Sequence, residues 1–516
     1  MRLRKLSLLL GTLVLALLLP GLASANVASQ FRVAIGSEAS FPSVAWTAQH
    51  NSYIVLQAWE AKRATELKAV NPNLNVLVYQ NLSAMARDTG PGGLSSSGVN
   101  YAEASSAHPE WFLINTSGSR ISEGGYSWLW MADTANPSYQ QQWTSNVLKV
   151  LSSGPWDGVV VDDTNTTARY HTEPSSIAKY PTDAAYQGAI RSILAYAGPR
   201  IQAAGKLVIP NMGSWNQYPE VVEEWLQYVS GGIDEMFAKW SATPGQGYRD
   251  ASGWQTQIEE IQSTERMGKR FLAITQAEPS DQQAIRYGWG SVLLGANGYT
   301  AYSAAANYNS EEWCGECEAQ IGEPTSAATK IAGGAWERSF TGGLVVVNPT
   351  TVTVGVNLDA AYSGSGLTNA TTATMPAHTA LVLQRAGGGQ VTGSEAGLGS
   401  QGGESSGAGS SATASGGKGS SGTTSSPTGT VPVEGGSSAP PSSGASTQVG
   451  KSSSTGSGHT QKLPGHHRSK ATSRARGASI NVRATKCVKA VMPGHATARK
   501  HRRGSHTSAR MTRPCR

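Results

Sequence analysis

The sequence predicts an α/β protein: a (β/α)8 TIM barrel, a small antiparallel β-sandwich domain, and then a disordered linker and a basic tail. Eight short apolar runs alternate with segments of helical periodicity between residues 53 and 303. Residues 336–384 are rich in β-forming pieces joined by turn residues. All 37 Trp, Tyr and Phe residues lie between Phe31 and Tyr362, so the chain beyond them has no large ring to anchor a core.

The eight apolar runs are the predicted barrel strands. Most are continuous rather than alternating, as expected for parallel strands buried on both faces. Eight strand and helix units over about 300 residues fit a barrel, whereas an open doubly wound sheet lacks its G-x-G-x-x-G signature here. The runs are YIVLQ from Tyr53, NVLVYQN from Asn75, WLWMADT from Trp128, GVVVDDT from Gly158, LVIPNM from Leu207, GIDEMF from Gly232, FLAITQ from Phe271 and GYTAYS from Gly298.

The helices between these runs have recognisable ends. Asn136-Pro137 is typical of a helix start, and Trp143, Val147, Val150 and Leu151 follow on one stripe before Gly154 ends it. The segments 219–231 and 280–295 have the same pattern. We therefore assign the barrel to residues 26–333 and the small β domain to residues 334–386, which bury too little surface to be stable without the barrel.

The N-terminal segment, residues 1–25, has the layout of a cleavable secretory signal. Arg2, Arg4 and Lys5 precede an apolar run, and the small residues Ala23-Ser24-Ala25 follow it. A membrane anchor is the alternative, but about 14 apolar residues are shorter than the roughly 20 that a spanning helix needs. We expect a secreted protein, with association at the cell surface as a variant of that prediction.

Charge separates the predicted domains from the C-terminal segments. Residues 26–386 carry 21 Lys/Arg against 31 Asp/Glu, while residues 461–516 carry 15 Lys/Arg and no acid. Between them, 41 of the 74 residues in 387–460 are Gly or Ser, which predicts a flexible linker. The basic tail is expected to contact anionic wall polymer or a membrane surface; an unselected extension is the alternative. Nucleic acid is a weaker candidate because the tail has no aromatic residue to stack on bases.

The four cysteines are compatible with export. Cys314-Gly-Glu-Cys317 is a lone C-x-x-C, so we predict a loop-closing disulfide rather than a metal or redox site. Cys487 and Cys515 could pair with each other, and their connectivity stays open.

The candidate site residues end the predicted strands, because barrel enzymes build their sites at the carboxyl ends of the strands. Histidine is absent from these positions, and the chain has no H-x-H or H-E-x-x-H, so neither a metal site nor a cofactor is expected. G-x-S-x-G is also absent from residues 26–386, which disfavours a serine nucleophile. The polar residues concerned are Gln57, Tyr79, Gln80, Asn81, Asp133, Asp162, Asp163, Asn211, Glu235, Gln276, Glu278 and Tyr302.

Paired carboxylates remain as the predicted catalysts, and they break glycosidic bonds: one carboxyl group protonates the leaving oxygen while the other attacks or activates water. We assign Asp162 or Asp163 together with Glu235 to these roles. Alternating side-chain directions let one of the two aspartates point into the barrel mouth, and we favour Asp162. The predicted substrate-binding residues are Tyr79, Asn81, Trp130, Asp133, Asn211, Trp240, Gln276, Glu278 and Tyr302.

Several motifs in residues 31–385 resemble glycoside hydrolases of the GHL15 type and, through them, other secreted barrel glycosidases such as the polygalactosaminidase-like group. The motifs are HPEWFLINTSG from His108, MADTANPSYQQQW from Met131, DGVVVDDTN from Asp157, GIDEMF from Gly232 and LVVVNPT from Leu344. The resemblance implies a (β/α)8 glycosidase in which Asp162 and Glu235 are the catalytic carboxylates. At Asp163 the related sequences often have Asn.

The sequence therefore predicts a monomeric, exported glycoside hydrolase that cleaves O-glycosyl bonds of an extracellular polysaccharide. A non-catalytic carbohydrate-binding protein on a degenerate barrel, tethered to the wall by the basic tail, is the first alternative. A structural wall protein is the second.

Overall fold

The computed structural model describes residues 27–36, 43–124, 126–308 and 314–386. The predicted signal segment 1–25, the linker 387–460, the basic tail 461–516, Cys487 and Cys515 lie outside the described residues. Among the described residues, no helix is both long enough and apolar enough to cross a membrane.

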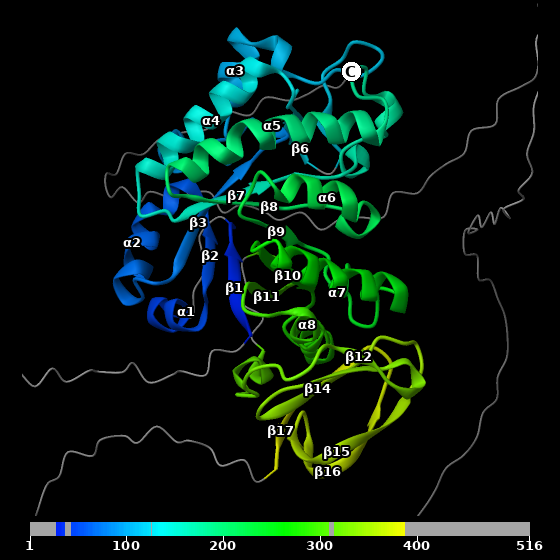
Figure 1. The fold of residues 1–516 in the computed structure, drawn as a ribbon. Coiled ribbons are helices and arrows are strands. Elements are labelled where there is room, and N and C mark those ends of the chain that lie inside the picture. The colour runs from blue at the N-terminus through cyan, green and yellow to red at the C-terminus, as the bar shows by residue number, and fades with distance from the viewer. Residues whose placement is uncertain (1–26, 37–42, 125, 309–313, 387–516) are drawn as a thin grey trace, which may run out of the picture. The chain divides into compact units, whose positions relative to one another are not determined.

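Eight parallel strands form the central sheet, in the order β8-β7-β3-β2-β1-β11-β10-β9 (Figure 1). A parallel bridge between Asn211 and Ile233 joins the two outer strands and closes the barrel. The predicted (β/α)8 barrel is thus confirmed. The strands are β1 (Ala28–Ala34), β2 (Tyr53–Leu56), β3 (Asn75–Asn81), β7 (Gly158–Asp162), β8 (Leu207–Pro210), β9 (Gly231–Asp234), β10 (Arg270–Gln276) and β11 (Thr300–Ala305).

One predicted barrel strand is wrong and one barrel strand was not predicted. The run from Trp128 belongs to β6 (Tyr126–Met131), which pairs with β4 (Ala84–Ala86) and β5 (Ser122–Glu123) in a separate antiparallel sheet. The first barrel strand is β1, in which Ser29, Gln30 and Arg32 interrupt the continuous apolar pattern that most of the other strands have. Both differences lie before β7 in the chain, and one strand lost is replaced by one gained. β7 is therefore the fourth barrel strand, as predicted.

The barrel interior explains which side chains reach the site. A central core cluster takes at least one buried residue from each of the eight strands. Because side chains alternate along a strand, residues two positions further on also point inward, at the carboxyl end of the barrel. The central residues are Phe31, Val55, Leu77, Val160, Ile209, Ile233, Leu272 and Ala301.

Helices cover the outside of the barrel strands (Figure 1). The predicted helix start at Asn136 is confirmed, because its side chain accepts hydrogen bonds from the backbone N–H groups of Ser138 and Tyr139. Trp143, Val147 and Leu151 of the same helix are buried against the barrel. The helices are α1 (Val44–His50), α2 (Ala61–Val70), α3 (Tyr101–Ala107), α4 (Pro137–Ser152), α5 (Asp183–Ala203), α6 (Pro219–Leu226), α7 (Ala251–Arg266) and α8 (Gln282–Gly295).

An antiparallel β domain follows the barrel. Its strand order is β12-β13-β14-β17-β15-β16, and the sheet folds over so that Leu344 and Val346 pack with Val354 and Val356. The other face of this sheet packs against α8 and is part of the barrel core. The contact is close, because a Cβ added at Gly290 of α8 would lie only 2.5 Å from the Cβ of Ala380. The strands are β12 (Thr329–Lys330), β13 (Trp336–Ser339), β14 (Gly343–Asn348), β15 (Val354–Gly364), β16 (Leu367–Met375) and β17 (Thr379–Arg385).

Candidate active site

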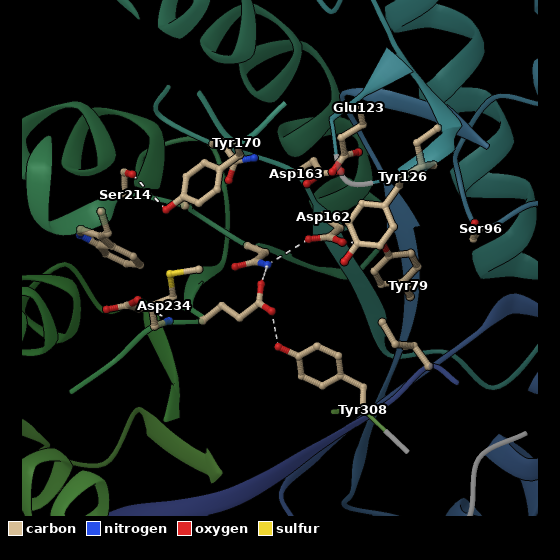
Figure 2. Close-up of a pocket in the computed structure, with 18 of the residues that line it drawn as sticks. Tyr79, Ser96, Glu123, Tyr126, Asp162, Asp163, Tyr170, Ser214, Asp234 and Tyr308 are labelled. Atoms are coloured by element: carbon tan, nitrogen blue, oxygen red, sulfur yellow. Dashed lines mark hydrogen bonds between the residues drawn. The ribbon is translucent and has the colours of Figure 1, made fainter. Parts of the chain in front are cut away.

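Four polar side chains converge at the carboxyl ends of the barrel strands. Tyr79, Asp162, Asn211 and Glu235 each lie two positions beyond a residue of the central core cluster, so strand alternation points all four inward. They line a cavity of about 430 Å³ (Figure 2). Parallel strands end at the same edge of a sheet, and therefore residues far apart in sequence meet here.

Asn211 links the two carboxylates at the centre of this cavity. Its Nδ2 donates to Oδ1 of Asp162 at 2.9 Å and to Oε2 of Glu235 at 2.5 Å. Those two carboxylate oxygens are consequently no farther apart than the sum of these distances, 5.4 Å. Asp162 and Glu235 face each other, as the sequence analysis expected of one of the two aspartates.

Two phenols complete the hydrogen bonds of the carboxylate pair. Tyr79 donates its hydroxyl proton to Asp162, and Tyr308, beyond the end of β11, donates to Glu235 (Figure 2). Burial, followed by the nearby carboxylate charges, raises the pKa of both tyrosines well above its usual value. Both phenols therefore remain protonated donors at any physiological pH. The side-chain amide of Gln276 donates to the backbone carbonyl of Glu235 at 2.9 Å and supports the same loop.

Glu235 is held closer to its neutral form than an exposed glutamate. Burial and then the charge of Asp162 raise the pKa of Glu235, against the hydrogen bonds from Tyr308 and Asn211, which lower it. A carboxyl group with a raised pKa beside an anionic partner has the character of a general acid.

Asp163 also lines the cavity, and its backbone leaves the strand geometry after Asp162. Its φ of 55° is in the left-handed region, which Asp and Asn adopt more readily than most residues. Asn81 donates its side-chain N–H to the Asp163 carboxylate, and Ser83 Oγ donates to its backbone carbonyl at 2.7 Å. Burial and the Asp162 charge raise the pKa of Asp163 to about 8.

Asp163 belongs to a cluster with Glu123 and His171, in which one ligand-type atom from each residue lies within 4.8 Å of the others. His171 Nδ1 is 3.3 Å from Glu123 Oε1, and both side chains are buried. Burial lowers the pKa of His171, but the carboxylates of Glu123 and Asp163 outweigh it and the pKa is raised. This donor set is one that could hold a metal ion.

The family of the chain is decided by its sequence. The family model described as hypothetical glycosyl hydrolase family 15, GHL15, matches residues 68–344. The chain belongs to this family. This family is described as one of glycosyl hydrolases, and the paired carboxylates in the cavity are the groups that such enzymes use.

Solved structures are also similar to the chain. The glycoside hydrolase domain of PelA from Pseudomonas aeruginosa is 17% identical, with a TM-score of 0.39, covering 55% of this chain and 96% of that one. Aspergillus fumigatus Ega3 in complex with galactosamine is 11% identical, with a TM-score of 0.35, covering 56% and 95%. The maltogenic α-amylase AmyB from Thermotoga neapolitana is 10% identical, with a TM-score of 0.41, covering 69% and 98%. No curated protein matches the chain significantly in sequence.

Seven of the nine predicted substrate-binding residues are not among the described residues that line the cavity: Asn81, Trp130, Asp133, Trp240, Gln276, Glu278 and Tyr302. Trp130 packs against the hydrophobic core, and Tyr302 is buried with its hydroxyl donating to the Ile285 carbonyl. Tyr302 follows the inward-pointing Ala301, so alternation turns it outward toward α8. Trp240 is 54% exposed. Substrate contact by these residues stays a prediction that their positions do not favour.

Asp133 and the cysteines have structural partners. Asp133 is buried and accepts a hydrogen bond from Lys179 Nζ at 2.6 Å and another from the Tyr180 hydroxyl. Cys314 and Cys317 are joined in a disulfide bond.

Sequence patterns do not single out Tyr308, Glu123, His171 or the aromatic residues that line the cavity. The aromatic residues come from β6, where Tyr126 (Figure 2) and Trp128 line the cavity together with the aliphatic Leu129. The run from Trp128 was recognised as apolar, but its assignment to the barrel concealed that it flanks the site. Tyr308 and His171 lie in connecting segments, where no periodicity marks a functional residue.

Proposed function

We propose that this protein is a secreted glycoside hydrolase that cleaves O-glycosidic bonds of an extracellular polysaccharide, with Asp162 as nucleophile and Glu235 as general acid and base. One observation carries the proposal: a single amide nitrogen of Asn211 bridges the two carboxylates inside the cavity. The family supports the reaction class. The signal-like segment at residues 1–25 supports export.

The environments of the two carboxyl groups divide their roles. Asp162 accepts hydrogen bonds from Tyr79 and Asn211, which stabilise a negative charge on it. Glu235 has a raised pKa because it is buried near that charge, which favours the proton-carrying form. Asp163 faces Glu123 and His171 and takes no direct part.

The separation of the carboxylates favours retention of configuration. Retaining enzymes hold the two groups about 5–5.5 Å apart, whereas inverting enzymes need about 6.5–9.5 Å to admit a water molecule. The distance between Asp162 Oδ1 and Glu235 Oε2 is at most 5.4 Å, which is shorter than inverting enzymes need. We therefore propose a double displacement.

In the first step Glu235 donates its proton to the glycosidic oxygen, the bond from that oxygen to the anomeric carbon breaks, and Asp162 bonds to the carbon. In the second step Glu235 takes a proton from water, whose oxygen attacks the same carbon and releases Asp162. Glu235 is protonated again at the end, so the cycle consumes one water molecule per bond.

The cavity lining favours an uncharged or amine-bearing glycan. Its carboxylates are Glu123, Asp162, Asp163, Asp234 and Glu235, and among the described lining residues Arg249 is the one lysine or arginine. Tyr126 and Trp128 offer aromatic faces for stacking on sugar rings. Anionic polymers would be repelled by this lining.

The proposal is tested by reducing-sugar release from neutral, amine-bearing and acidic polysaccharides, with Asp162→Asn and Glu235→Gln beside wild type. We expect each substitution to lower kcat by at least about 10³-fold. Asp133→Asn is the matched control, because Asp133 is a buried strand-end aspartate that does not line the cavity. NMR of the first product should show the anomer of the substrate.

Full activity in both cavity variants would overturn the assignment of residues. Glycan binding by wild type without release of any product would favour the non-catalytic carbohydrate-binding protein instead. An inverted first product would refute the double displacement alone.

A further inference from the structure

The cluster of Glu123, Asp163 and His171 lies beside the carboxylate pair but is not used by the proposed mechanism. Glu123 ends β5, Asp163 follows β7, and His171 follows the 3-10 turn Ala168–Tyr170. Figure 2 shows Glu123 and Asp163 close together at the edge of the cavity, above Asp162. Two of the three residues line that cavity.

Two buried polar atoms of this cluster have no hydrogen bond to any residue that the structure describes. They are Nδ1 of His171 and Oε2 of Glu123. The His171 side chain is 1% exposed and that of Glu123 is 7% exposed, so solvent cannot readily satisfy either atom. Buried polar atoms without partners are rare in native proteins, and an unplaced ion or water is a common reason. His171 Nδ1 lies 3.3 Å from Glu123 Oε1, but the two atoms do not have the geometry of a hydrogen bond.

We propose that Glu123, Asp163 and His171 bind a divalent transition-metal ion of the zinc class. Ligand atoms 2.0–2.2 Å from a tetrahedral zinc lie about 3.3–3.5 Å from one another, which matches the separation of His171 Nδ1 and Glu123 Oε1. The ligand atom of Asp163 lies within 4.8 Å of those of Glu123 and His171. A rotation of the Asp163 side chain would bring it to the ligand-to-ligand separation of a zinc site.

The donor set selects the class of ion. One imidazole with two carboxylates suits zinc and its first-row neighbours, whereas calcium and magnesium prefer oxygen ligands alone. Two ionised carboxylates also balance a dication. Arg249, the one lysine or arginine among the described cavity-lining residues, donates to the carbonyl of Met236.

The surrounding chain holds the ligands in place. The backbone N–H of Gly124 donates to the carbonyl of His171 at 3.0 Å, which ties the segment of Glu123 to that of His171. A Cβ at position 124 would lie 2.9 Å from that same oxygen, so glycine permits the approach. The side-chain amide of Asn165 is 3.1 Å from His171 Nε2. With a metal on Nδ1, Nε2 carries the proton, and the oxygen of a flipped Asn165 amide would accept it, as is usual for the outer partner of a metal-bound histidine.

Three protein ligands leave one tetrahedral position for water or a substrate oxygen. Because Glu123 and Asp163 line the cavity, that position would open toward the bound glycan. The bound ion would also hold the Asp163 carboxylate in this cluster. Glu123 and Asp163 are 40 residues apart and Asp163 and His171 are 8 apart, so no short motif predicts this site.

The test measures zinc binding by the full chain after treatment with a chelator. Calorimetric titration gives the stoichiometry for wild type, Glu123→Gln, His171→Gln and the control His108→Gln. His108 forms an exposed pair with Glu110 at 3.1 Å, so the control removes one histidine from another His–Glu pair. The six histidines after residue 458 are common to wild type and Glu123→Gln, and any binding by them cancels in the comparison.

We expect wild type and His108→Gln to bind one zinc equivalent that Glu123→Gln and His171→Gln either do not bind or bind with an affinity lower by more than about 100-fold. Zinc should raise the Tm of wild type and His108→Gln and leave the Tm of the two cluster variants unchanged. Circular dichroism without metal checks that each variant is folded, and Glu123→Gln suffices if His171→Gln does not fold. Equal stoichiometry and affinity in wild type and Glu123→Gln, or a wild-type Tm that zinc does not raise, would overturn the site. These readouts do not depend on glycosidase activity.

Discussion

Asp133 and Asp162 look alike in the sequence, since each ends an apolar run, yet the structure gives them opposite surroundings. Asp133 accepts a charged hydrogen bond from Lys179 at 2.6 Å and does not line the cavity. Asp162 lines the cavity and accepts from the neutral donors Asn211 and Tyr79. A carboxylate paired with a cation acts as a structural tie. A carboxylate that is held by neutral donors beside a second carboxylate keeps a charge that can act on a substrate.

The largest effect expected from this difference is at Asn211. Asn211→Ala removes the donor shared by Asp162 and Glu235, which leaves the two carboxylates unsupported and free to repel each other. We expect kcat to fall about 100-fold or more, measured on whichever polysaccharide wild type hydrolyses. Gln140→Ala is the control, because Gln140 is a buried amide near Asp133 that donates to the Thr134 carbonyl. A comparable loss in both variants would show a general folding defect.

The second effect is expected in stability rather than in activity. Asp133→Asn removes the charge-assisted bond to Lys179 and disturbs the bond from Tyr180. We expect a loss of about 1–2 kcal/mol in the free energy of unfolding, at the low end for a buried charge because Lys179 is 55% exposed. Urea denaturation measures it, and kcat at a temperature where the variant is folded should stay within about threefold of wild type. A large fall in kcat with unchanged stability would mean that Asp133 belongs to the site.

The barrel and the position of Asp162 could be predicted because both follow from short periodicities. Alternation from Val160 fixes Asp162 as inward-pointing, and the same rule applied from Ala301 places Tyr302 in the core. The first barrel strand escaped prediction because Gln30 and Arg32 interrupt its apolar pattern, although Arg32 is 4% exposed.

The parts of the site that come from connecting segments could not be predicted in this way. Tyr308 lies three residues beyond β11, and His171 lies in a connection between β7 and α5, where side-chain direction depends on tertiary packing. The left-handed backbone of Asp163 is equally invisible in the motif V-D-D-T. Periodicity therefore located the carboxylate pair but not the groups that surround it.

The smallest effect is expected in the pH profile of Tyr308→Phe. In the proposed mechanism Glu235 must carry a proton, so kcat/KM falls as pH rises through its pKa. The hydrogen bond from Tyr308 lowers that pKa by stabilising the ionised form, against the raising effects of burial and Asp162. Loss of the bond should raise the pKa and move the alkaline limb of the kcat/KM profile to higher pH, with a change in the maximal rate of no more than about tenfold.

Tyr170→Phe is the matched control for this profile, because Tyr170 also lines the cavity but accepts its hydrogen bond from Ser214 rather than contacting Glu235. Its alkaline limb should coincide with that of wild type. A limb that moves to lower pH in Tyr308→Phe would mean that the phenol supports the protonated form of Glu235. A limb that stays in place in both variants would mean that Glu235 is not the group that titrates, and the division of roles between Asp162 and Glu235 would have to be reversed.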